Sequence, residues 1–352
     1  MSVLDSVLYR KSIQRKAAEI ESDHKVILVT GATGLIGSCI VDILLLANTE
    51  FNKCNTVYAL GRSYDKLSHR FSYYIGDYLK YVEQDITSPL NIDDKIDYII
   101  HGASNADPGA YARFPAETLL TNVYGAANVL NYCKEHKHCR MILLSTFEVY
   151  GLVDEKNEQK ESNYGLIDYN MVRSCYPESK RSAEILARCF CEEYGVDAII
   201  ARLSSVYGPT MLKTDNKAHA QFIRNAIAGE NIVLKSKGTQ RRTYTYLMDA
   251  VGGIFYLLMH GKGNEAYNIA NSDSIVTIAN LAKTIAEIYG LKVIYEHPDE
   301  KEKKGYSVPQ NCVLISDKIE SIGWKPVYSL RAGLQETVDI MREMRKYNVG
   351  RT

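Results

Sequence analysis

The 352-residue chain has no net charge, because its 42 Lys and Arg residues balance its 42 Asp and Glu residues. We therefore expect neither a nucleic-acid partner nor an anionic membrane surface. No uninterrupted apolar run is long enough to cross a bilayer. The eight cysteines are scattered without the spacing of a disulfide framework, and no secretory signal precedes the first expected strand. A soluble, reduced, cytoplasmic protein is the expectation.

A metal site is not expected either. Cys133, His136, His138 and Cys139 gather at one place in the sequence, but their C-x-x-H-x-H-C spacing matches no common structural zinc pattern. We interpret them as a polar helix end.

The length of the chain, 352 residues, suffices for one large or two modest domains.

The most informative stretch is 25–37, KVILVTGATGLIG. Its apolar run predicts a strand buried on both faces, and an apolar helix is expected after its glycines. Backbone N–H groups and the helix dipole make a strand–turn–helix junction an anion site, so we predict dinucleotide binding. The predicted cofactor contacts are Gly31, Thr33, Gly34, Leu35, Ile36 and Gly37.

Alternation of strands and helices continues beyond this stretch. Strands are expected at 56–60, 81–86, 96–100 and 141–144, and a long helix at 118–136. The pattern predicts an α/β fold with a Rossmann-type doubly wound parallel sheet, whose ligands bind at the carboxyl ends of the strands. Gly31, Arg62, His101 and Ser145 all follow such ends. The pattern of residues 1–24 predicts an amphipathic arm. We favour a helix that packs on its own domain over a helix that binds a partner.

The second strand ends without the carboxylate that usually holds the ribose 2′-hydroxyl. Arg62 stands there instead and could meet a 2′-phosphate, which would favour NADP or relaxed NAD(P) use. It could equally be a solvated loop residue, so NAD and NADP both stay open.

Tyr176-Pro177-Glu178-Ser179-Lys180 carries the second chemical signal. Pro177 suits the first turn of a helix, and Tyr176 and Lys180 share a face four residues apart. A neighbouring ammonium and the helix N-terminus favour the phenolate, so we expect a lowered pKa for Tyr176. The same lysine could hydrogen-bond a nicotinamide ribose.

With these motifs in order, residues from about 25 to about 342 resemble the extended short-chain dehydrogenase/reductases that modify nucleotide sugars, within the NAD-dependent epimerase/dehydratase family. The resemblance rests on GATGLIG at 31–37, Asp85-Ile86, HGAS at 101–104, Asn122, STFEVYG at 145–151, YPESK at 176–180, RLSSVYGP at 202–209, GTQRRTYTYLMDA at 238–250, YNIAN at 267–271 and GWKP at 323–326.

The resemblance implies roles for individual residues. Tyr176 would be the base, Lys180 its activator, Thr146 the hydroxyl that holds the 4-oxygen of the sugar, and Glu148 a further catalytic group. Further cofactor contacts would come from Asp85, Ile86, Ala103, Ser104, Asn122, Ser145 and Leu203. Substrate contacts would come from Ser205, Thr210, Val233, Arg242 and Tyr267.

The resemblance also implies an organisation. A dinucleotide-binding domain would comprise 25–203 with a returning segment at about 241–270. A smaller nucleotide-sugar lobe would comprise 204–240 and 271–345. A homodimer would be built on the helices at 118–136 and 177–194.

The reaction is less determined than the family. Dehydratases carry Thr-Asp-Glu where this chain has Thr146-Phe147-Glu148, and a phenyl ring cannot supply a proton. Glu148 and the loop 104–115 resemble UDP-glucuronate decarboxylases, although Phe147, Ser205 and Thr210 depart from that pattern. Decarboxylation ranks first, 4-epimerisation second and 4,6-dehydration third. A simple ketoreductase and an inactive cofactor-binding scaffold stay as alternatives.

Overall fold

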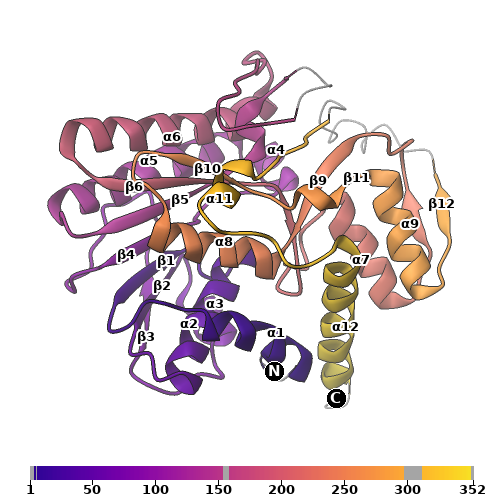
Figure 1. The fold of residues 1–352 in the computed structure, drawn as a ribbon, viewed down its shortest axis with the longest axis horizontal. Helices are drawn as coiled ribbons and strands as arrows, with labels where there is room; N and C mark the ends of the chain where they lie inside the picture. Colours follow the sequence, from indigo (N-terminus) through magenta and orange to yellow (C-terminus); the bar gives the residue numbers. More distant parts are fainter. Residues whose placement is uncertain (1–3, 5, 154–157, 297–310, 350–352) are drawn as a thin grey trace.

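The computed structural model describes residue 4 and residues 6–153, 158–296 and 311–349 (Figure 1). Its main sheet has seven parallel strands in the order β10-β6-β5-β4-β1-β2-β3. Their bounds are β1 Val26–Thr30, β2 Thr56–Gly61, β3 Leu79–Glu83, β4 Tyr98–His101, β5 Arg140–Thr146, β6 Asp197–Leu203 and β10 Ala266–Ile269. The order reverses between β1 and β4, and such a switch point opens a crevice at the carboxyl edge. The predicted doubly wound fold is confirmed.

Helices cover both faces of this sheet (Figure 1). One face carries α5 (Pro115–Glu135) and α6 (Cys175–Tyr194), and the other carries α2 (Leu35–Glu50) and α8 (Leu247–His260). Successive strand residues point to opposite faces, so Ile27 and Val29 pack with α2 while Leu28 packs with α5. Complete burial of such a side chain is worth about 1.5–3 kcal/mol.

Within the described residues 6–24, one helix lies on the chain itself, as favoured above. Helix α1 (Val7–Ala18) buries Tyr9, Ile13 and Ala17 and touches α2, α8 and α12 (Leu330–Val349). The Tyr9 hydroxyl donates to Asp42 at 2.7 Å, and the Ser6 hydroxyl donates to Glu343 at 2.5 Å. The arm therefore links the first large helix to the last.

A smaller lobe lies beyond β6. Its strands form a three-stranded sheet, β11-β9-β7, and a two-stranded sheet, β12-β8. The elements are β7 Ser205–Tyr207, α7 Ala218–Ala228, β8 Ile232–Leu234, β9 Arg241–Tyr246, β11 Ile275–Thr277, α9 Ile278–Tyr289, β12 Val293–Tyr295, α11 Asp317–Ser321 and α12. The returning segment is therefore split: β10 joins the main sheet as expected, whereas β9 belongs to the smaller three-stranded sheet.

Four short helical segments complete the neighbourhood of the crevice: the helices α3 (Tyr64–Arg70) and α4 (Pro108–Arg113) and the 3₁₀ turns η2 (Phe147–Tyr150) and η3 (Val172–Ser174). A further 3₁₀ turn, η4, spans Ser272–Ser274. Within the described residues, no helix is both long and apolar enough to cross a membrane.

Candidate active site

The glycine turn after β1 is a cradle that only glycine can form. Gly31 has a φ of +70°, and a Cβ there would lie 2.8 Å from the Gly102 carbonyl oxygen. A Cβ on Gly37 would lie 2.4 Å from the Gly31 oxygen. Both contacts are shorter than real Cβ atoms make, so the glycines let β1, the start of α2 and the end of β4 come together.

The polar groups around this cradle suit a dinucleotide. Gly34 caps α2 without any side-chain hydrogen bond, which leaves N–H groups of the first turn for an anion. Two buried atoms near the crevice, Ser104 Oγ and Asn122 Oδ1, have no hydrogen-bond partner among the described residues. Buried polar atoms are rarely left unpaired, and a bound ligand would satisfy these two. The residues present therefore fit NAD.

Thr30 fixes the opposite wall of the cradle. Its Oγ1 accepts from the N–H groups of Gly102 and Ala103, both at 3.1 Å, and lies 2.8 Å from His101 Nδ1. Since the hydroxyl accepts twice, its own proton is directed to the imidazole. Burial and the charge of Lys180 lower the pKa of His101 to about 3, which matches a neutral ring in that acceptor role.

Arg62 has a partner that the sequence did not reveal. Its Nη1 donates to Glu117 Oε1 at 2.7 Å, and both side chains are substantially exposed. Glu117 comes from α5, more than fifty positions away, so a carboxylate does lie near the end of β2. Asp85 Oδ1 accepts from Thr87, and the adjoining Ile86 is buried against Gly125.

Tyr176 and Thr146 meet at the carboxyl edge of the sheet. Both are buried, and they lie close enough together for Thr146 to act on the titration of the phenol. Burial raises the pKa of Tyr176, and the charge of Glu148 raises it further, whereas Thr146 and the charge of Arg173 act to lower it. The expected net lowering is therefore not found, because removal of the phenol from water outweighs its cationic neighbour.

Lys180 is buried close to the tyrosine, but its ammonium is directed to the sheet. Its Nζ donates to the Leu144 carbonyl at 3.0 Å. Burial lowers the pKa of Lys180 to about 8, although the charge of Glu184 acts to raise it. Glu184 also accepts from Ser145 Oγ at 2.5 Å. Sequence reasoning missed Glu184, although it follows Lys180 by one helical turn.

Asn122, on α5, is hydrogen-bonded to the start of α6. Its Nδ2 donates to Ser179 Oγ at 2.8 Å, and Ser179 in turn donates to the Tyr176 carbonyl at 2.8 Å. The predicted cofactor residue thus reaches the helix that carries Tyr176. Leu203 is buried as the last residue of β6, at the same edge of the sheet.

Glu148 forms a bidentate ion pair that the sequence did not predict. Arg173 Nη1 donates to Glu148 Oε2 at 2.8 Å, and Nη2 donates to Oε1 at 3.0 Å. The guanidinium carbon lies 5.0 Å from the centroid of the Tyr111 ring, and that ring is stacked on Tyr176. Arg173 and Tyr111 come from η3 and α4, and no local pattern singled them out.

The predicted substrate residues divide into two groups. Arg242 lies over the Phe147 ring at 5.7 Å, and Thr210 donates to the Leu35 carbonyl at 2.7 Å, so both adjoin the crevice. Ser205 opens β7, while Val233 lies in the separate strand β8.

Tyr267 does not join them. Its ring is buried in β10, and its hydroxyl accepts from the Lys262 N–H at 3.1 Å, before the start of that strand. The structure therefore places Tyr267 in the edge of the main sheet, away from its carboxyl end, and corrects its assignment to the substrate.

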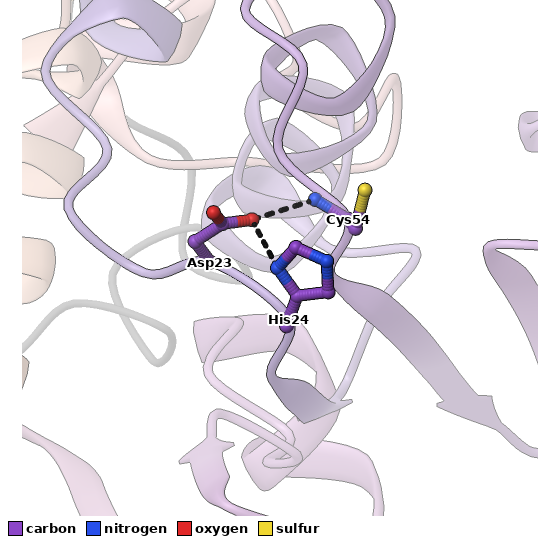
Figure 2. A group of neighbouring side chains, drawn as sticks. All are labelled: Asp23, His24 and Cys54. Carbon is purple, nitrogen blue, oxygen red and sulfur yellow. Dashed lines mark hydrogen bonds and ion pairs between the residues drawn. The ribbon is translucent and has the colours of Figure 1, made fainter.

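Among the described residues, a single group has three metal-type donors within 4.8 Å of one another: Asp23, His24 and Cys54 (Figure 2). Asp23 Oδ1 already accepts from the Cys54 N–H and lies 3.0 Å from His24 Nδ1. The group precedes β1 and β2, at the edge opposite the crevice. The Cys133 cluster is no such group, and its Cys133 and Cys139 sulfurs are 3.6 Å apart.

Known proteins share this architecture. UDP-glucuronic acid decarboxylase 6 of Arabidopsis thaliana is 34% identical over 315 residues, covering 88% of this chain and 86% of that protein. UDP-glucuronic acid decarboxylase 1 of Xenopus tropicalis is 31% identical over 327 residues, covering 92% and 73%. The dTDP-glucose 4,6-dehydratase of Streptomyces venezuelae, solved with NAD, is 26% identical with a TM-score of 0.74, covering 92% of this chain and 98% of that one.

A family model matches residues 27–270, which include the glycine cradle, Thr146, Tyr176 and Lys180. The match spans more than half of the chain, and the chain therefore belongs to the NAD dependent epimerase/dehydratase family.

Proposed function

We propose that this enzyme decarboxylates a UDP-glucuronate-like nucleotide sugar after transient oxidation at C4. The observation that carries the proposal is the buried pair of Thr146 and Tyr176, with Glu148 beside it, at the strand edge that also holds the glycine cradle. Relatives that are 31–34% identical are UDP-glucuronic acid decarboxylases, which supports this substrate over a neutral hexose.

The residues account for the proton movements. Tyr176 takes the proton of the C4 hydroxyl, and Thr146 holds the C4 oxygen. Bound NAD would accept the C4 hydride and return it at the end, so no net cofactor is consumed. Gly31, Gly34, Ser104 and Asn122 would hold it.

Oxidation at C4 turns the uronic acid into a β-keto acid. The C5–C6 bond breaks and CO2 leaves. The electron pair of that bond passes to an enolate, whose charge rests on the C4 oxygen near Thr146 and Tyr176. C5 then takes up one proton. Glu148, which is paired with Arg173, would control that proton, while Phe147 offers none.

Epimerisation at C4 is the second candidate. It needs the same oxidation but a sugar that turns over within the site. Such a rotation has no use for the carboxylate of Glu148, which Arg173 holds beside Tyr176, and this supports decarboxylation first. Dehydration ranks third, because Phe147 replaces the proton donor of that reaction.

Incubation with UDP-glucuronate, UDP-glucose and UDP-galactose tests the proposal directly. We expect CO2 release and a UDP-pentose product from UDP-glucuronate alone, without net change in nicotinamide absorbance. A product of unchanged mass with inverted C4 would instead identify an epimerase. Stoichiometric oxidation of added cofactor would identify a ketoreductase, and no turnover of any sugar would leave a cofactor-binding scaffold.

The finer assignments belong to the same proposal. We favour NAD over NADP, because Glu117 neutralises part of the charge that Arg62 would offer a 2′-phosphate. The dinucleotide-binding domain would comprise 25–203 with the returning segment at about 241–270, which supplies α8 and β10, and the substrate lobe would comprise 204–240 and 271–345. The eight cysteines, all described, form no disulfide, which suits a cytoplasmic location.

A homodimer through α5 and α6 also belongs here. The two helices pack side by side (Figure 1), and their outward faces expose Leu120, Tyr124 and Ile185. Light scattering should give twice the monomer mass for the wild type. Ile185→Glu should give the monomer, since a buried charge in that interface would lack a partner. A wild-type monomer would refute this interface.

A further inference from the structure

Arg173 contacts both halves of the proposed catalytic apparatus. With one edge it holds Glu148 through two hydrogen bonds of 2.8 and 3.0 Å. With its face it lies over the Tyr111 ring, 5.0 Å from the centroid. A planar guanidinium can do both at once, whereas an ammonium can do neither in this way.

Tyr111 links Arg173 to the proposed base, Tyr176. Its ring is 2% exposed and lies 5.0 Å from the Tyr176 ring, with 20° between the ring planes. Guanidinium, Tyr111 and Tyr176 therefore form one stack, and such ring pairs are worth about 0.5–1.5 kcal/mol beyond their buried area. The side chains of Arg173 and Glu148 keep 31% and 18% exposure, so this end of the stack is reached by solvent.

We propose that Arg173 is a positioning residue that fixes Glu148 and Tyr176 in one mutual geometry, directly through the carboxylate and indirectly through Tyr111. The inference rests on the proposed function, since it assigns Glu148 and Tyr176 to the same reaction. It adds a role for η3 and for the tyrosine of α4, neither of which carries a group that reacts.

The charges around Tyr176 decide the expected pH effect. The groups that face it from other elements are Glu148, Arg173, Tyr111 and Thr146. Lys180, on the same helix, is bonded to the sheet and opposed by Glu184. Arg173 is thus the cation whose charge lowers the pKa of Tyr176, and its loss should make the phenolate harder to form.

Replacement of Arg173 by Met and by Lys tests the proposal. Arg173→Met should lower kcat about 10- to 100-fold, because a small misplacement of reacting groups has that effect. The KM for UDP-glucuronate should change less than about threefold, and the rising limb of the rate–pH profile should move to higher pH. Arg173→Lys should return the profile toward that of the wild type but recover only part of kcat.

Tyr111 provides the second arm. Tyr111→Leu removes the ring and should reproduce the loss of kcat, while Tyr111→Phe keeps the ring and should restore most of it. Arg331→Met is the matched control, since Arg331 of α12 lies 4.0 Å from Glu287 of α9 in an exposed pair. Circular dichroism and bound NAD content establish that each variant is folded.

Wild-type kcat and an unmoved pH profile in Arg173→Met would overturn the inference. Crystal structures of that variant give a readout without turnover: we expect the rings of Tyr111 and Tyr176 to shift, and unshifted rings would also overturn it. If the wild type turns over no nucleotide sugar, the proposed function fails, and the ring positions alone decide the positioning role.

Discussion

Arg173–Glu148 and Arg202–Glu184 are built alike, yet they lie in different surroundings. Each is a bidentate pair, and each guanidinium also lies over a tyrosine ring, 5.0 and 4.9 Å from its centroid. The side chains of the first pair are 31% and 18% exposed, and those of the second are 12% and 5% exposed. The same contacts thus hold a carboxylate at the crevice, the one that we propose to be catalytic, in one case and join buried side chains in the other.

The difference teaches where such a pair matters. A buried charge that loses its partner destabilises the fold strongly, because water cannot replace the partner. A partly exposed pair contributes less to stability than a buried one, because water can reach the groups that its removal leaves behind. We therefore expect substitutions near the crevice to affect the rate, and substitutions at the interior pair to affect folding.

The largest expected effect is on the rate. Tyr176→Phe should lower kcat by about 10²–10⁴, the usual contribution of a positioned acid or base, with unfolding and NAD content unchanged. Steady-state decarboxylation of UDP-glucuronate measures the loss. Tyr164→Phe, at an exposed position, is the control. Turnover near the wild-type rate would show that another group is the base.

At the interior pair, Arg202–Glu184, a substitution should lower the stability of the fold more than the rate. Arg202→Met leaves Glu184 buried and unpaired, and should reduce the free energy of unfolding by about 3–5 kcal/mol. Urea unfolding followed by circular dichroism measures it. Arg331→Met should change stability by less than about 1 kcal/mol. A similarly small change in Arg202→Met would end the contrast between the two pairs.

Acid should lower the free energy of unfolding, because His101, beside the crevice, is held neutral. Because the pKa of His101 is lowered to about 3, the unfolded chain binds its proton first as the pH falls below about 6.5. The stability contributed at neutral pH is then lost toward pH 3, at up to about 1.4 kcal/mol per pH unit.

His101→Gln should therefore have a shallower loss of stability between pH 6.5 and pH 5, a difference of about 2 kcal/mol over that range. Thermal unfolding in a pH series measures it, with His69→Gln, an exposed position, as the control. Parallel curves for the wild type and His101→Gln would contradict the assignment.

The smallest expected effect concerns metal removal. Asp23, His24 and Cys54 lie at the opposite edge of the sheet, about 16 Å away along five residues of β1. Dialysis against EDTA should therefore change the decarboxylation rate by less than about twofold. A loss that added Zn²⁺ reverses would instead connect that group to activity.

Local signals were enough for the frame of the site. The glycine spacing predicted the cradle because close approach there depends only on the absence of a Cβ, as the Gly31 and Gly37 contacts show. The strand at 56–60 and the helix carrying Tyr176 were likewise predicted from the residues that form them. Bounds shifted by a few positions, as for β3, which begins and ends earlier than expected.

Long-range partners were out of reach of the same reasoning. Glu117 meets Arg62 across 55 positions, and Arg173 meets Glu148 across 25, and no spacing rule links such pairs. The pKa direction of Tyr176 failed for a related reason: burial is a property of the assembled fold. Tyr267 failed because a motif letter does not reveal to which end of the sheet a side chain points.

The Ser6–Glu343 hydrogen bond joins positions that leave the ribosome 337 residues apart. Helix α1 can find Asp42 as soon as α2 emerges, yet Ser6 must wait for Glu343 until α12 has been made. A chain terminated before α12 would thus carry an arm with one of its two anchors missing.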